Sequence, residues 1–245
     1  NIRLLYEFDY DYYQSRGRSV TNCQNDANAL ITRMTPIFDR DLNVRLILAG
    51  VIVHTSNDGV FTGDGYSKIS QLNNRWADPV LRNIYHPNCV QLISGTSLGT
   101  PIGVAYVGSV SNVGISVIYG LYSSDIHSRA MLSSHEVGHC LGINHDPTTY
   151  TACMDEPLLY IMTPVFNVNG YERFSQCSIS EGRAFLPRQT SLTCCGDTNR
   201  DGIVTLQDLF DFIDFYFAQN ILADANGDGR VSFDDIFSFL NCYFN

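Results

Sequence analysis

Two kinds of hydrophobic pattern alternate along residues 1–194. The segments Ile2–Phe8 and Val44–Val53 are strand-like, and the second is a nearly continuous apolar run that is typical of a strand buried on both faces. Between them, Asp26–Phe38 carries apolar residues at helical spacing. The same patterns predict further helices at Ser67–Trp76 and Arg129–Leu141, and further strands at Gly103–Val110 and Ile115–Tyr119. The alternation predicts an α/β domain in which a sheet is covered by helices.

Residues 195–245 show a different pattern, which repeats. The segment DTNRDGIVTLQDLFDFIDFYF, which begins at Asp197, realigns with DANGDGRVSFDDIFSFLNCYF, which begins at Asp224, so the period is 27 residues. Each copy is an aspartate-rich loop followed by a short helical pattern. We therefore expect two domains, residues 1–194 and 195–245, the second a small all-α module of two loop–helix repeats.

Composition and charge narrow the class of protein. With 44% hydrophobic residues the chain can bury a core, which excludes disordered and collagen-like classes. The net charge is −10, and residues 195–245 hold nine Asp and two Arg, so −7 of it lies in the second domain. This excess of negative charge argues against nucleic acid as a partner, because surfaces that bind phosphate need a surplus of Lys and Arg.

The chain carries no sign of membrane insertion. No apolar run reaches the roughly 18–20 residues that span a bilayer. The first residues, NIRLLYEFDYDYY, lack the basic and then apolar layout of a signal peptide. We therefore expect a chain with no membrane span that has already been processed.

The strongest candidate for chemistry is a cluster of three histidines. His135 and His139 are separated by one helical turn, so both imidazoles can reach one ion. Gly142 permits the positive φ that ends a helix sharply, and the turned chain can then bring back His145 as a third ligand. Three neutral imidazoles with a fourth position left for water describe a catalytic zinc site, and Glu136 lies beside it.

These residues resemble those of the metzincin metalloendopeptidases, and specifically of the adamalysin or reprolysin branch. The branch is marked by Asp146, which directly follows the third histidine. Tyr160–Met162 is similar to the family's Met-turn, in which a methionine, here Met162, lies beneath the zinc ligands. Phe174–Ser178 (FSQCS) is similar to another family segment. The resemblance covers residues 1–190 and implies an α/β (α+β) metzincin-type fold, a mixed, twisted sheet with covering helices and an active-site helix.

The resemblance implies a secreted zinc endopeptidase that cleaves proteins or peptides. Glu136 would act as general base, accepting a proton from water on the zinc as that water attacks the scissile carbonyl. The substrate would pair as an extra strand with Gly103–Gly108. The residues that we expect to contact it are Gly103, Val104, Ala105 and Tyr106 on that strand, and Pro164, Val165 and Phe166 after the Met-turn.

The acidic repeats have the ligand spacing of calcium loops. Oxygen ligands recur at loop positions 1, 3, 5, 7 and 12, the seventh through the backbone carbonyl. The first set is Asp197, Asn199, Asp201, Ile203 and Asp208, and the second is Asp224, Asn226, Asp228, Arg230 and Asp235. The spacing predicts two bound Ca²⁺. The module resembles dockerin type I, which implies a possible cohesin-like partner, and its many aromatic residues leave self-assembly open as well.

The eight cysteines contain no CxxC pair, which favours four disulfides and an extracellular location. The family resemblance implies Cys153–Cys177. A Cys195–Cys242 bridge would join the two ends of the C-terminal module. The pairing of Cys23, Cys89, Cys140 and Cys194 stays open, since eight cysteines allow 105 connectivities.

A second class of function competes with the enzyme. The chain could be an extracellular structural or assembly subunit that keeps a metzincin fold and makes its main contact through the dockerin-like tail. The intact set of His135, Glu136, His139 and His145 favours the enzyme, because a purely structural descendant has no need of Glu136.

Overall fold

The computed structural model divides the chain into two compact units. It describes residues 1–146, 157–165, 170–186, 196, 198, 204–225 and 230–244. One unit is Ile2–Leu186, and the other comprises Asn1 together with Pro187–Asn245. Each unit is described here by itself.

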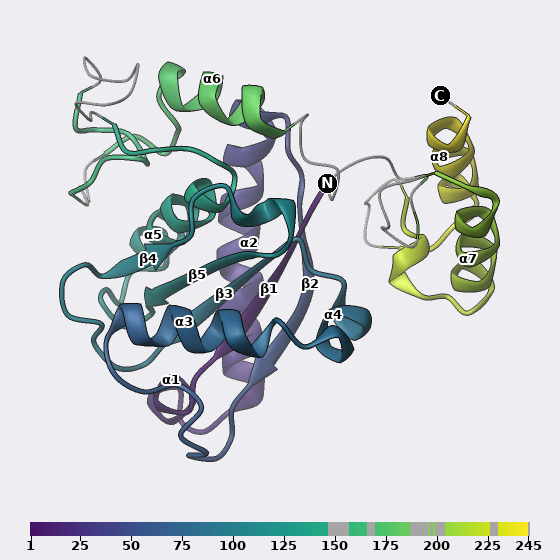
Figure 1. Ribbon diagram of the computed structural model, residues 1–245. Helices are drawn as coiled ribbons and strands as arrows, with labels where there is room; N and C mark the ends of the chain where they lie inside the picture. The colour runs from purple at the N-terminus through teal and green to yellow at the C-terminus, as the bar shows by residue number, and fades with distance from the viewer. Residues whose placement is uncertain are drawn as a thin grey trace. The chain divides into compact units, whose positions relative to one another are not determined.

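The larger unit is built on a five-stranded sheet (Figure 1). Its strands are β1 (Ile2–Phe8), β2 (Leu46–Val53), β3 (Cys89–Ser94), β4 (Gly103–Ala105) and β5 (Gly114–Tyr119). Their order across the sheet is β2-β1-β3-β5-β4. Four strands are parallel, and β4 pairs antiparallel with β5 at one edge. The mixed α/β class predicted from the sequence is therefore correct for this unit.

Helices cover both faces of this sheet. The helices of this unit are α1 (Tyr10–Ser15), α2 (Val20–Leu42), α3 (Gly65–Arg75), α4 (Pro79–Tyr85), α5 (Ile126–Cys140) and α6 (Gln176–Phe185). In Figure 1, α3 crosses the front of the sheet and α2 lies behind it. Among the described residues, none of the helices combines the length and apolar character needed to cross a membrane.

Successive side chains along each strand point to opposite faces of the sheet, so each face has its own core. On one face Leu5, Val90 and Val117 pack with Leu72 of α3 and with Trp76, the residue that follows this helix. On the opposite face the hydroxyl of Tyr6 lies 3.2 Å from both Met34 Sδ of α2 and Ser133 Oγ of α5. Because α5 is fixed against the sheet by this second core, its remaining surface is free to form a site.

The predicted strand Gly103–Val110 is wrong beyond Ala105. The Ser109 hydroxyl donates to the carbonyl of Tyr106 at 2.7 Å, and Gly108 adopts a positive φ of 68°. Both features belong to a turn, so strand β4 ends and a 3₁₀ turn follows at Ser109–Ser111. The backbone N–H of Gly108 instead donates to the carbonyl of His139 at 2.8 Å.

The sequence patterns did not reveal β3. Its apolar run is interrupted by Gln91, which is fully buried. The amide of Gln91 donates to Ser116 Oγ on β5 at 3.0 Å and accepts from the Ser133 hydroxyl of α5. A polar residue in a central strand is tolerated here because its hydrogen bonds are made inside the protein.

The expectation that all eight cysteines pair is wrong in this structure. Cys23, Cys89 and Cys140 are buried free thiols. Cys23 lies on the buried face of α2, where cysteine serves as a small apolar residue. Cys177 and Cys242 are disulfide-bonded. Cys153, Cys194 and Cys195 lie outside the described residues, so the two predicted pairings stay predictions.

The smaller unit reproduces its sequence repeat in three dimensions. Its helices are α7 (Leu206–Phe217) and α8 (Phe233–Tyr243). The equivalent rings of Phe212 and Phe239 stack at 4.1 Å between centroids, 8° from parallel. This stack is the centre of the small core, so the two repeats bury each other's apolar faces.

The same two helices leave other aromatic and apolar side chains exposed. Six of them are Leu206, Phe210 and Phe217 in the first repeat, and Phe233, Phe237 and Phe244 in the second, and Ile213 of α7 is exposed as well. Each of the three in the second repeat lies 27 residues after one of the three in the first, so the repeats share three exposed positions.

Candidate metal centre

Helix α5 positions two of the three histidines. It begins after Asp125, whose carboxylate accepts a hydrogen bond from the backbone N–H of Ser128 at 2.9 Å. His135 and His139 lie one turn apart near its C-terminal end. Gly142, at a φ of 82°, then reverses the chain, and this turn returns His145 to the first two imidazoles.

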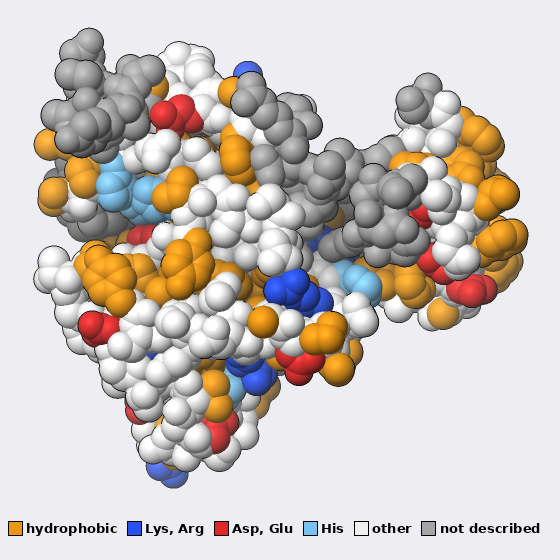
Figure 2. All heavy atoms as spheres, viewed as in Figure 1, with side chains coloured by type: hydrophobic (Ala, Val, Ile, Leu, Met, Phe, Trp, Pro, Cys, Tyr) orange, Lys and Arg blue, Asp and Glu red, His pale blue; other side chains and the backbone are white. Residues whose placement is uncertain are grey.

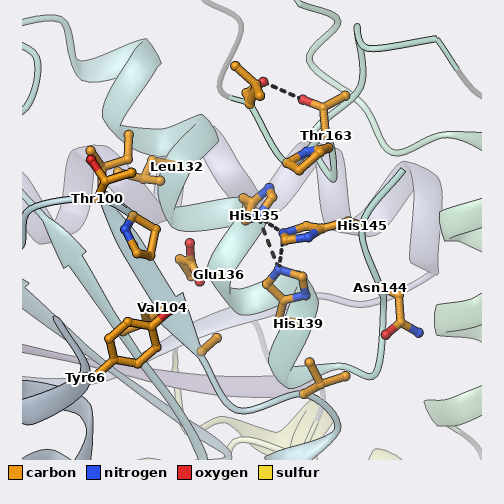
Figure 3. Close-up of a pocket in the computed structure, with 17 residues that line it drawn as sticks. Tyr66, Thr100, Val104, Leu132, His135, Glu136, His139, Asn144, His145 and Thr163 are labelled. Atoms are coloured by element: carbon orange, nitrogen blue, oxygen red, sulfur yellow. Dashed lines mark hydrogen bonds between the residues drawn. The ribbon is translucent and has the colours of Figure 1, made fainter. Parts of the chain in front are cut away.

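The three imidazoles meet at a single point (Figure 3). The Nε2 atom of His135 lies 3.1 Å from those of both His139 and His145, and the latter two are 3.0 Å apart. This triangle fits one cation at about 2.0–2.1 Å from each nitrogen, the distance at which zinc binds imidazole. Among the described residues, this is the cluster that can hold a metal.

The opposite ring nitrogens fix the tautomer of two of these histidines. His135 Nδ1 lies 2.7 Å from the carbonyl oxygen of Ile161, and His139 Nδ1 lies 2.8 Å from that of Ile143. Since a carbonyl can only accept, both Nδ1 atoms carry hydrogens and both Nε2 atoms carry lone pairs.

Burial keeps the three imidazoles neutral. It lowers the pKa of His135 to about 3 and that of His139 to about 4, and the neighbouring imidazoles add to both shifts. Burial also lowers the pKa of His145. Neutral rings with inward-facing lone pairs are the form that binds a metal.

Glu136 lies between the histidines and the edge strand β4 (Figure 3). Only 4% of the residue is exposed. Burial raises the pKa of its carboxyl well above the usual range, and the Cys140 thiol adds to this effect. A carboxylate in such a setting is a stronger proton acceptor than one in water.

Met162 is fully buried against Gly138 of α5, the residue that precedes His139. A β-carbon on Gly138 would be 2.7 Å from Met162 Sδ, so this glycine allows the methionine to approach the helix. The carbonyl of Met162 accepts the backbone N–H of Asp146 at 2.8 Å. The carboxylate of Asp146 in turn accepts the Ser178 hydroxyl of α6 at 2.8 Å, which ties the third ligand's loop to α6.

The centre opens into a cleft of about 730 Å³. Figure 2 shows the imidazoles at its surface, bordered by hydrophobic side chains. Of the residues predicted to contact a substrate, Gly103, Val104, Ala105, Pro164 and Val165 line the cleft. Tyr106 is not among the described residues that line the cleft, and Phe166 lies outside the described part of the chain.

The cleft has further walls that the sequence analysis missed. They are Tyr66, Thr100, Pro101, Ile102, Val107, Leu132, Asn144 and Thr163. Leu132 precedes His135 by three residues on one helix, so helical spacing could have revealed it. The others come from loops and from α3, which only the fold brings to this place.

The predicted calcium ligands are described only in part. Asp208 and Asp235 are fully buried, Asp224 is half-buried and Arg230 is exposed. An oxygen of Asp208 accepts the backbone N–H of Thr205 at 2.8 Å, and Asp235 does the same for Ser232 at 2.7 Å. Both aspartates therefore also cap their helices. Asp197, Asn199, Asp201, Ile203, Asn226 and Asp228 lie outside the described residues.

The fold and this centre define a metal-binding α/β domain with an open three-histidine site beside a buried glutamate. Residues 2–198 match the family described as Reprolysin (M12B) family zinc metalloprotease. The chain belongs to this reprolysin family of zinc metalloproteases.

Individual relatives agree with this family. The chain is 29% identical over 161 residues to the zinc metalloproteinase-disintegrin-like atragin of Naja atra. The match covers 65% of this chain and 25% of the relative, so the chain spans about a quarter of that protein's length. A solved structure of a chaperone-substrate complex is similar at 17% identity and a TM-score of 0.49, covering 75% of this chain and 33% of the other. That similarity adds nothing to the description of the fold.

Proposed function

We propose that the chain is a secreted, zinc-dependent endopeptidase that hydrolyses peptide bonds in proteins. The observation that carries this proposal is the triangle of Nε2 atoms beside Glu136, in a cleft that runs along an open sheet edge. Disulfide bonding of Cys177 and Cys242 supports an oxidising compartment.

Strand β4 provides the support for an extended peptide. Its partner β5 lies on one side, and the cleft lies on the other. The carbonyl of Ile102 and the N–H of Tyr106 are bonded to β5. Since hydrogen-bonding groups alternate in direction along a strand, those of Gly103 and Ala105 face the cleft, where a substrate backbone would pair with them.

Each residue of the centre has a task in hydrolysis. His135, His139 and His145 would hold the zinc, which when bound acts as a Lewis acid toward water and the scissile carbonyl. Glu136 accepts the proton of the attacking water and then delivers a proton to the leaving amine. Its buried position favours this role, because a carboxylate of raised pKa binds a proton more readily.

The substitution Glu136→Gln tests this function. It should leave the zinc content at one per chain and abolish cleavage of a denatured protein substrate, and a zinc chelator should abolish cleavage by the unmodified chain. Glu172→Gln, at an exposed residue, is the matched control. Full cleavage by the Glu136→Gln variant would overturn the mechanism.

For the smaller unit, we propose that each repeat binds one Ca²⁺. The support is the ligand spacing in the sequence, together with Asp208 and Asp235, which hold the last loop position in buried and equivalent places. Titration of the metal-free chain should give two calcium ions per molecule.

We further propose that this unit anchors or assembles the protein through a cohesin-like partner or a second copy of itself. The six exposed apolar side chains at equivalent positions of the two repeats support this role. They also favour the alternative of an extracellular assembly subunit. Sedimentation with and without calcium tests self-assembly. A pull-down with a cohesin-type domain tests the cohesin-like partner. The cleavage assay with the Glu136→Gln variant decides between an enzyme and an assembly subunit.

A further inference from the structure

Cys89 and Cys140 bring two thiols together in the interior of the larger unit. Cys89 is the first residue of β3, and Cys140 is the last residue of the histidine-bearing helix α5. Both are fully buried. Hydrogen bonding to the Cys140 side chain raises the pKa of the Cys89 thiol well above its usual range, so the two side chains are neighbours.

A glycine on the next strand leaves the space that these sulfurs share. Gly114 of β5 pairs in register with Cys89. A β-carbon on Gly114 would lie 2.7 Å from Cys89 Sγ, 2.9 Å from Cys140 Cβ and 3.3 Å from Cys140 Sγ. Any larger residue at this position would therefore separate the two thiols or displace α5.

This arrangement differs from that of an ordinary buried cysteine. Cys23 on α2 fills space as a small apolar side chain would. In the pair, by contrast, each sulfur faces the atom with which it could bond, and the two residues lie on elements that the fold already holds together. Oxidation of the two thiols would therefore join β3 to α5.

We propose that Cys89 and Cys140 are an oxidisable dithiol that closes to a disulfide during oxidative folding. The oxidant is a small disulfide such as oxidised glutathione. One cysteine thiolate attacks it, forming a mixed disulfide and releasing one glutathione thiol. The second cysteine then attacks its partner's sulfur, so the Cys89–Cys140 bond forms and a second glutathione leaves. The two protons and two electrons of the dithiol end on the two glutathione molecules.

Burial determines when this reaction takes place. Neither sulfur is accessible in the folded unit, so the exchange occurs before α5 has packed on β3 and β5. The bond then ties the residue that follows His139 to the central strand of the sheet. It closes a loop of roughly 50 residues, which removes conformational freedom from the unfolded chain.

Peptide mapping of the full chain tests the bond directly. The protein is refolded with oxidised and reduced glutathione, alkylated under denaturing conditions, and digested with trypsin and chymotrypsin, which together cleave between Cys140 and Cys153. We expect a cross-linked peptide that joins Cys89 to Cys140, while Cys23 is alkylated. Recovery of both cysteines as alkylated thiols would overturn the proposal, and so would a bond from either one to another cysteine.

Thermal unfolding gives an independent measurement. The Cys89→Ala/Cys140→Ala double variant should unfold at a Tm roughly 10 °C below that of the oxidised wild-type chain. Cys23→Ala is the control, since it removes a buried thiol but keeps the cross-linked peptide. If the wild-type map contains the peptide, the bond is established even where the double variant fails to fold. If the wild-type map lacks the cross-linked peptide and Cys23→Ala lowers the Tm as much as the double variant does, the loss of stability comes from packing alone and the proposal is wrong.

Discussion

Gly103 lies so close to Glu136 that a β-carbon on the glycine would be 2.8 Å from the carboxyl carbon of the glutamate. The edge strand β4 therefore approaches the helix α5 at Gly103, where the absence of a side chain leaves room for Glu136. This contact fixes the distance between the proposed proton acceptor and the backbone along which a substrate would lie.

Gly103→Ala should displace the Glu136 carboxylate while leaving the three imidazoles in place. A misplacement of about 1 Å can cost about 100-fold in turnover, so we expect kcat to fall by about that factor with zinc content unchanged. Gly65→Ala is the matched control, since a β-carbon there would meet only ordinary contacts of 3.5 Å or more. Equal activities of the two variants would contradict the role of this contact.

His54 makes the stability of the larger unit depend on pH. Burial of its ring disfavours the charge, but hydrogen bonds to the carboxylates of Glu7 and Asp58, at 2.7 and 3.2 Å, outweigh burial and raise its pKa. The pKa of a histidine in the unfolded chain is about 6.5, and that of His54 in the folded chain is higher. The stabilisation that protonated His54 provides is therefore complete below about pH 6.5 and is lost as the pH rises through its folded-state pKa.

The Tm of the wild-type chain should therefore fall more steeply above pH 6.5 than that of His54→Gln. Differential scanning calorimetry from pH 6 to 9 measures both slopes, and His127→Gln on α5 serves as the control. Parallel curves for wild type and His54→Gln would show that this histidine binds no extra proton on folding.

Ser178 supports the third histidine through Asp146. Both residues are fully buried, and the serine hydroxyl donates to the aspartate carboxylate. Ser178→Ala should lower the free energy of unfolding by about 2 kcal/mol, because a buried hydrogen bond to a charged group is lost. Ser180→Ala, at an exposed position on the same helix, should change it by no more than about 0.5 kcal/mol. Chemical denaturation measures the difference, and similar values for both variants would contradict it.

Asp208→Asn should reduce calcium binding from two ions to one. The asparagine keeps an oxygen for the Thr205 N–H, so helix α7 stays capped, but the carboxylate that the ion needs is gone. Isothermal titration measures the stoichiometry, with the exposed Asp214→Asn as control. Two ions bound with unchanged affinity by Asp208→Asn would place the ligand elsewhere.

The sequence alone identified features whose parts lie close together in the chain. His135, Glu136, His139 and His145 lie within one helix and its following turn, so helical geometry and one glycine were enough to predict the cluster. The 27-residue repeat likewise predicted the paired helices of the smaller unit. Strands β1, β2 and β5 were predicted from the apolar residues that predominate within each segment.

Only the tertiary structure decided the features that join distant segments. The approach of Gly103 to Glu136, the position of Met162 under Gly138 and the meeting of Cys89 with Cys140 all depend on how strands and helices pack. Strand β3 was hidden for the same reason, because the partners that satisfy Gln91 lie on β5 and α5. Local periodicity reports which face of an element is buried, whereas long-range packing determines which element covers that face.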